Sequence, residues 1–150
     1  MTSLNTSASL IHLPRVAPVS WEMLPDDRAP ARLRVWVMAQ LSHHQLQCLG
    51  DDLALIASEL AANALRHGGT PAHVSMVIAE QDDGTTRVRM EVVDGGPGFD
   101  ADQVTHSWEA SEFVDQCSGR GLFIVAELSH SWGSRRLNPG QLVWAELSTD

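Results

Sequence analysis

The chain has 150 residues and a mass of 16.3 kDa, with ten basic residues, 19 acidic residues and a formal net charge of −9. This length predicts a single domain that can bury about 70% of its unfolded surface without disulfides or a structural metal. Lysine is absent, which excludes Schiff-base and P-loop lysine chemistry. An acidic chain without a basic run is also a poor binder of nucleic acids and anionic membranes.

The two cysteines, Cys48 and Cys117, belong to no CxxC or Cys/His cluster. This usage argues against a zinc site and fits free thiols in a reducing compartment. The sequence has neither a long apolar run nor the pattern of a signal peptide. We therefore expect a cytoplasmic protein that does not cross a membrane.

The N-terminal residues 1–28 are expected to form an extension with short extended or strand pieces at residues 10–13 and 18–21. A single domain is expected over residues 29–150. Within it, residues 29–41 predict a helix, because apolar side chains recur at helical spacing and Pro30 fits the first turn.

A second helix is predicted at residues 51–67, which Asp51 or Asp52 can cap and which ends before a Gly-Gly pair. Residues 73–80 and 86–93 alternate between apolar and polar side chains around a turn, which is typical of a β-hairpin.

Residues 95–119 show no periodicity, and so long a segment predicts a functional lid or disorder. A helix at residues 122–128 and a second hairpin, with strands at residues 132–137 and 141–147, complete the chain. This order is packed most simply as an α+β fold with helices on one face of a largely antiparallel sheet. We expect three methionines to fill its core: Met38, Met76 and Met90.

The first of three motifs that carry chemistry lies on the second helix. Glu59, Asn63 and His67 are spaced i, i+4 and i+8 and therefore share one helix face. A carboxylate and a carboxamide facing a cleft could hold a hydrated Mg²⁺ and position a nucleophile. The alternative is an ordinary polar face on an amphipathic helix.

The second motif places Asp94 at the end of a buried strand, before glycines at alternating positions. Its carboxylate could accept a hydrogen bond from an exocyclic amine, and the glycines permit close approach of a ligand. A simple tight turn is the alternative.

The third motif, Gly119-Arg-Gly121, begins a helix and could direct free N–H groups at an anion. It is neither a Walker A loop nor a Rossmann fingerprint.

Taken together, the three motifs are much more specific than any one of them. Their order, Glu-x-x-x-Asn, Asp-x-Gly-x-Gly and Gly-x-Gly-Leu, resembles the N box and the two glycine boxes of the GHKL ATPase superfamily. The segments ELAANALRHG, VVDGGPGF and GRGLFIVAELSHSWG are similar to the stand-alone, actinomycete-type anti-sigma-factor serine/threonine kinases related to RsbW. The resemblance covers about residues 29–147.

The resemblance implies the Bergerat fold, an α/β sandwich with a mixed, mostly antiparallel sheet and with ATP or ADP between a helix and the lid. It implies that Asn63 binds Mg²⁺, that Glu59 is the general base and that Asp94 binds the adenine amino group. His67 matches a recurrent position that either contacts the nucleotide or packs at the helix end. The remaining implied nucleotide-binding positions are Gly96, Gly98, Gly119, Arg120, Gly121 and Leu122.

Two features depart from the family's pattern. A Thr on the late strand often helps the Asp to hold adenine, and the matching position after the last turn is Leu142. Residues 97–118 contain no Arg or Lys, but they contain five acids: Asp100, Asp102, Glu109, Glu112 and Asp115. Because phosphoryl transfer requires charge neutralisation, this weakens the kinase prediction more than that of nucleotide binding.

Two functions therefore stay open. The first is an ATP-dependent kinase that phosphorylates a Ser or Thr of an anti-anti-sigma (STAS-type) protein and sequesters a sigma factor. The second is a partner-switching module that binds ATP with little or no turnover. The catalytic domain of a histidine kinase would need a dimerisation helix pair, for which residues 1–28 are too short. The expected partners are therefore a sigma factor, an anti-anti-sigma protein and, in a possible homodimer, a second copy of the chain.

Overall fold

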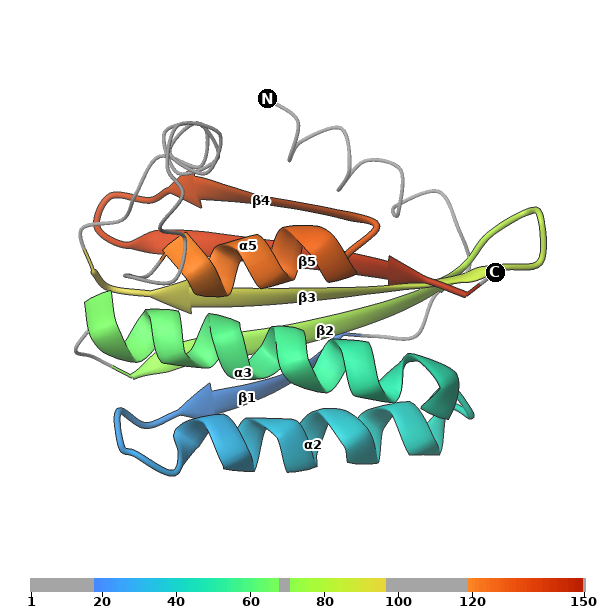
Figure 1. Ribbon diagram of the computed structural model, residues 1–150, viewed down its shortest axis with the longest axis horizontal. Helices are drawn as coiled ribbons and strands as arrows, with labels where there is room; N and C mark the ends of the chain where they lie inside the picture. Colours follow the sequence, from blue (N-terminus) through green and yellow to red (C-terminus); the bar gives the residue numbers. More distant parts are fainter. Residues whose placement is uncertain (1–17, 68–70, 97–118, 150) are drawn as a thin grey trace.

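The computed structural model describes residues 18–67, 71–96 and 119–149, which form a five-stranded sheet with helices on one face (Figure 1). In chain order the elements are β1 (Val19–Met23), α2 (Ala29–His43), the short 3-10 helix η1 (Gln47–Leu49), α3 (Gly50–His67), β2 (Ala72–Glu80), β3 (Thr86–Asp94), α5 (Gly119–Leu128), β4 (Ser131–Arg136) and β5 (Gln141–Ser148).

The strands are ordered β1-β2-β3-β5-β4, and every pairing between them is antiparallel. Both predicted hairpins are present, as β2–β3 and β4–β5. Because β5 and not β4 lies beside β3, the end of β3 is brought next to the start of β5. The prediction of an α+β fold is confirmed.

The core lies between the sheet and the helices α2, α3 and α5, which cover the same face (Figure 1). Helix positions enter it every three or four residues and strand positions every second residue, as the two periods require. Its main side chains are Leu33, Val37 and Leu41 of α2, Leu53, Ile56 and Leu60 of α3, Leu122 and Val125 of α5, and Met76, Met90, Val92 and Val143 of the strands.

The helix boundaries differ from the predicted ones by small amounts that have local causes. Helix α2 continues to His43. Helix α3 begins at Gly50, directly after the 3-10 turn η1, so Asp51 and Asp52 lie in its first turn and not at its cap. In that position their negative charges still interact favourably with the positive N-terminal end of the helix dipole. The predicted strand at residues 18–21 is β1, whereas residues 10–13 and 97–118 lie outside the described residues.

The prediction that Met38 fills the core is wrong. Met76 and Met90 are buried, but the side chain of Met38 is 39% exposed. It lies on the outer side of α2 against Gly50, where a Cβ would be 2.8 Å from its terminal methyl carbon. The methionine thus covers the backbone at the start of α3.

The face of the sheet that points away from the helices carries a buried ion cluster. Arg89 of β3 donates hydrogen bonds to Glu91, at 2.7 Å, and to Glu146 of β5, at 3.2 Å. Its guanidinium also lies 4.3 Å from the ring centroid of Trp144. Arg89 is therefore paired on several sides, as a buried charge requires.

Gly133 of β4 is the strand position that makes room for this tryptophan. It is the register partner of Trp144, and a Cβ at Gly133 would be 2.8 Å from the indole Cζ2. We expect Gly133→Ala to lower the free energy of unfolding by about 1–3 kcal/mol through overpacking. Urea unfolding would measure the loss, with Ser134→Ala on the same strand as the control.

Candidate functional site

Helix α3 presents Glu59 and Asn63 one turn apart on the same face. Glu59 is half-buried, whereas Asn63 is only 3% exposed. The Oδ1 atom of Asn63 is buried and has no hydrogen-bond partner in the part of the chain that the structure describes. Unpaired buried polar atoms are uncommon in folded proteins, and an oxygen of this kind is able to accept a hydrogen bond or to bind a cation. His67 is the last residue of α3, and its side chain is outside the described part of the structure.

Asp94 ends β3, with its side chain 5% exposed. The backbone N–H of Gly96 donates a 2.8 Å hydrogen bond to Asp94 Oδ1, which fixes the carboxylate and leaves Oδ2 for another donor. Gly140, in the β4–β5 turn, has a φ of 107°, and a Cβ there would run into the carbonyl of Asp94. The turn therefore packs directly against the end of β3.

The register of β3 and β5 corrects the position expected to assist Asp94. The partner of Asp94 is Gln141, while Leu142 is the partner of Val93. Because paired residues project from the same face and neighbours from opposite faces, Gln141 shares the helix-covered face with Asp94 and Leu142 does not. Gln141 is 1% exposed. The sequence signal for Gln141 is its place two residues before the apolar Val143, because alternate residues of a strand project from the same face.

Helix α5 connects the third motif to the first. It begins at Gly119, and its third residue, Gly121, is buried. A Cβ at Gly121 would lie 2.5 Å from Glu59 Oε2, so the carboxylate occupies the space a side chain would need. Leu122 is 2% exposed and packs in the core. The side chain of Arg120 and all of Gly98 lie outside the described residues.

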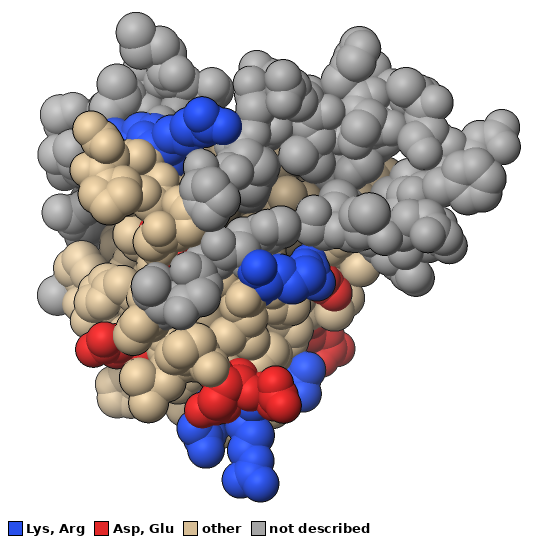
Figure 2. Space-filling view, turned by 90° about the vertical axis from the view of Figure 1, so that its left-hand side faces the viewer, with Lys and Arg blue, Asp and Glu red and all other residues tan. Residues whose placement is uncertain are grey.

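The end of α3, the end of β3 and the start of α5 lie at one end of the sandwich (Figure 1). This end includes exposed arginines on two elements, Arg66 near the end of α3 and Arg135 and Arg136 at the end of β4. Figure 2 views this end, with arginines in blue. Exposed positive charge therefore lies at the same end of the sandwich as the candidate site, on elements outside residues 97–118.

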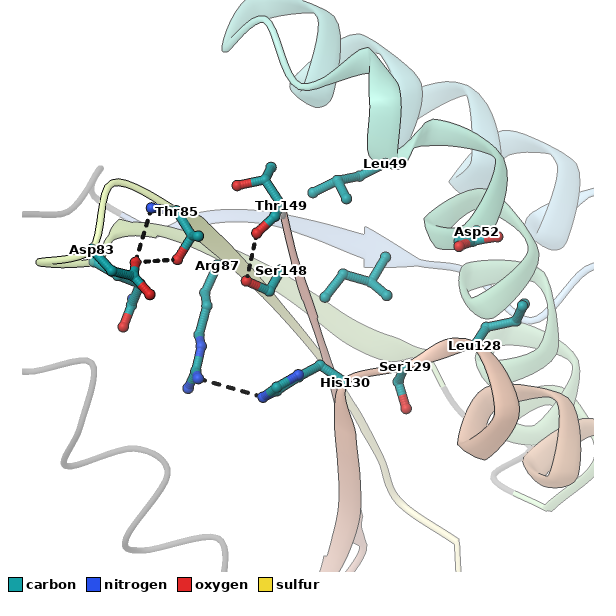
Figure 3. Close-up of a pocket in the computed structure, with 12 residues that line it drawn as sticks. Leu49, Asp52, Asp83, Thr85, Arg87, Leu128, Ser129, His130, Ser148 and Thr149 are labelled. Carbon is teal, nitrogen blue, oxygen red and sulfur yellow. Dashed lines mark hydrogen bonds between the residues drawn. The ribbon is translucent and has the colours of Figure 1, made fainter.

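A hollow of about 490 Å³ is found at the opposite end of the sandwich (Figure 3). The β2–β3 turn, the start of α3, the α5–β4 connection and the end of β5 line it. Arg87 and His130 lie there with 3.4 Å between guanidinium and imidazole nitrogens. None of the residues that the motifs single out lines this hollow.

Within residues 18–67, 71–96 and 119–149, no group of three or more His, Cys, Asp or Glu side chains could hold a metal ion. In the same part of the chain, no helix has the length and apolar character needed to cross a membrane.

Comparison with known proteins gives the class to which this fold and site belong. A model of the histidine kinase-like ATPase domain matches residues 24–147, and the chain is a member of that family. The chain is thus an ATP-binding domain of the GHKL type.

One curated relative is the signal transduction histidine-protein kinase AfsQ2 of Streptomyces coelicolor, which is 34% identical over 87 residues. The match covers 54% of this chain but only 15% of that protein. A chain of the SiaB–SiaC complex from Pseudomonas aeruginosa has the same fold, with a TM-score of 0.50, 12% identity and 97% of both chains covered. Full-length ShkA in complex with AMPPNP gives a TM-score of 0.49 at 25% identity, over 92% of this chain and 32% of that one.

Proposed function

We propose that the protein is a cytoplasmic serine/threonine kinase that binds Mg·ATP and phosphorylates an anti-anti-sigma (STAS-type) partner, and that it also holds a sigma factor. The observation that carries the nucleotide site is the buried, unpaired Oδ1 of Asn63. An amide oxygen is a hard donor, and Mg²⁺ usually takes few protein ligands together with waters and phosphate oxygens. The residues present therefore fit a metal held between Asn63 and a nucleotide.

Each of the other site residues has a role that its position supports. Bound Mg·ATP supplies the phosphoryl group and part of the charge neutralisation. Asp94, held by the Gly96 N–H, would accept a hydrogen bond from the adenine amino group, and Gln141 would lie beside it. Glu59 would accept the proton of the attacking hydroxyl. The lack of a side chain at Gly121 allows the Glu59 carboxylate to lie against the first turn of α5, whose N–H groups favour a phosphate.

The kinase and its partner are supported by the family and by a structural neighbour. The family's description is that of a histidine kinase-like ATPase domain, which supports ATP-dependent phosphotransfer in general. The neighbour from Pseudomonas aeruginosa was solved as a complex of two proteins, SiaB and SiaC, which supports a partner for a chain of this fold. Arg66, Arg135 and Arg136 could supply positive charge that residues 97–118 do not contain.

The match to AfsQ2 favours a second candidate, an ATPase domain that serves a phosphoacceptor histidine. The two functions differ in the bond formed. A phosphoserine or phosphothreonine survives acid, whereas a phosphohistidine is hydrolysed by it. Incubation with labelled ATP and candidate partners, followed by acid treatment, separates the two, because only the kinase proposed here leaves acid-stable label.

A third candidate is the partner-switching module that binds ATP without turnover. The five carboxylates of residues 97–118 favour it, since they oppose charge stabilisation of the transferring group. It predicts a nucleotide-dependent complex with the partner and no labelled product. Size exclusion with ATP and with ADP, run beside the label-transfer assay, distinguishes it from the kinase.

Asn63→Ala is expected to weaken binding of Mg·ATP by about 10–100-fold, since an interaction with a charged group is worth about 1.5–3 kcal/mol. Calorimetric titration would measure this affinity. The variant should remain folded, which circular dichroism checks, because Oδ1 of Asn63 makes no hydrogen bond within the described residues. Gln47→Ala, an exposed change in η1, is the control. Equal Mg·ATP affinity in wild type and Asn63→Ala would remove the central support for the site.

A further inference from the structure

The carboxylate of Glu59 lies against the start of α5. Gly121 is the third residue of that helix, and a Cβ built on it would be 2.5 Å from Glu59 Oε2 and 3.5 Å from Glu59 Cδ. The N–H groups of the first helical turn have no partner within the helix and form its positive end. An anionic side chain therefore lies beside the first turn of a helix whose start attracts anions.

A second observation, one turn further along α3, concerns a ligand for a cation. Asn63 lies one turn after Glu59 on the same face of α3, and no group of the described residues donates a hydrogen bond to its buried Oδ1. The helix start favours a phosphate, the carboxylate repels one, and the amide oxygen offers a ligand to a metal. A metal-complexed phosphate satisfies all three groups, whereas a bare phosphate is opposed by Glu59.

We propose that Glu59 determines which form of the nucleotide binds, by excluding metal-free ADP or ATP from the start of α5 and admitting the Mg²⁺ complex. This inference rests on the proposed nucleotide site and gives Glu59 a role in specificity besides that of a base. Two like charges about 4 Å apart near a protein surface repel strongly enough to change an affinity by more than tenfold.

Calorimetric titration of the full chain with ADP, in Mg²⁺ and in EDTA, tests the proposal without any turnover. The wild type is expected to bind Mg·ADP at least about tenfold more tightly than metal-free ADP. Glu59→Gln keeps the shape of the side chain and removes its charge. The affinity of this variant for metal-free ADP should rise at least about tenfold, while its affinity for Mg·ADP should change little. The preference for the metal complex should therefore shrink or vanish.

The control is Asp52→Asn, which removes an exposed carboxylate from the first turn of the same helix, far from Gly121. It should leave both affinities unchanged. Glu59→Ser provides a second neutral variant should Glu59→Gln unfold, and circular dichroism checks both.

The two proposals fail in different ways. A wild type that binds ADP neither with nor without Mg²⁺ would refute the proposed function. A wild type that binds ADP, with the same metal dependence in Glu59→Gln, would refute only the role of Glu59 in specificity. A large loss of Mg·ADP affinity in Glu59→Gln would show that Glu59 is a metal ligand, and this result would also overturn its proposed role in specificity.

Discussion

Glu59→Gln is expected to reduce phosphotransfer to the partner by about 10²–10⁴-fold, the contribution typical of a general base. Among the described residues of the Asn63 face of α3, Glu59 supplies the carboxylate that lies at the start of α5. Gln preserves its shape but cannot take a proton. Nucleotide and partner binding should persist. The variant should therefore still form the complex in size exclusion while it loses label transfer from ATP.

The matched control is Glu127→Gln, an exposed carboxylate near the other end of α5. It should transfer label as the wild type does. Undiminished transfer by Glu59→Gln would show that another group takes the proton. The wild type itself is expected to be slow, because residues 97–118 supply five carboxylates and no cation to the transferring group. Rapid transfer would contradict that argument but not the assignment of the base.

Asp94 is expected to give the wild type a preference of about 10–100-fold for ATP over GTP, the value of one charged hydrogen bond. Guanine has a carbonyl where adenine has an amino group, so a buried carboxylate would face an acceptor. Asp94→Ala should lower ATP affinity by a similar factor and remove most of the preference. Competition titrations with ATP and GTP would measure both quantities, with the thermal midpoint as a check on folding.

Two changes on β5 test the register that places Gln141 beside Asp94. Gln141→Leu should weaken ATP binding, because it removes a polar group from the face of Asp94. Leu142→Thr should not strengthen it, although a Thr was expected to assist Asp94 from that position, because residue 142 projects from the opposite face. Stronger ATP binding by Leu142→Thr would mean that the register differs in solution.

The helices and hairpins follow from local periodicity, so the sequence predicts them well. The spacing of Leu33, Val37 and Leu41 on one helix, and the alternation along β2 and β3, need no knowledge of the rest of the chain. Local spacing is also the reason why the prediction for Met38 is wrong. Its spacing suits the core, but the choice between core and the outer side of α2 depends on how α3 begins at Gly50.

The site was predicted in part, because its motifs are local but their contacts are not. The helical spacing places Glu59 beside Asn63 without any structure. The contact of Glu59 with Gly121 depends on how α3 packs against α5, which no local pattern specifies. Gln141 was missed because the sequence does not fix the strand register. A shift of one residue moves every side chain of a strand to the other face of the sheet, and so exchanges Gln141 with Leu142.

The β2–β3 turn lies at the end of the sandwich opposite the candidate site (Figure 1). β3 is nine residues long and therefore spans about 30 Å between this turn and Asp94. Asp82, Asp83 and Gly84 are exposed there, and Asp83 accepts hydrogen bonds from Thr85, whose side chain is the main cause of the lowered pKa of that carboxyl. A tether through the exposed side chain of Asp82 would thus immobilise the domain on a sensor surface with its motif-bearing end directed into the solution.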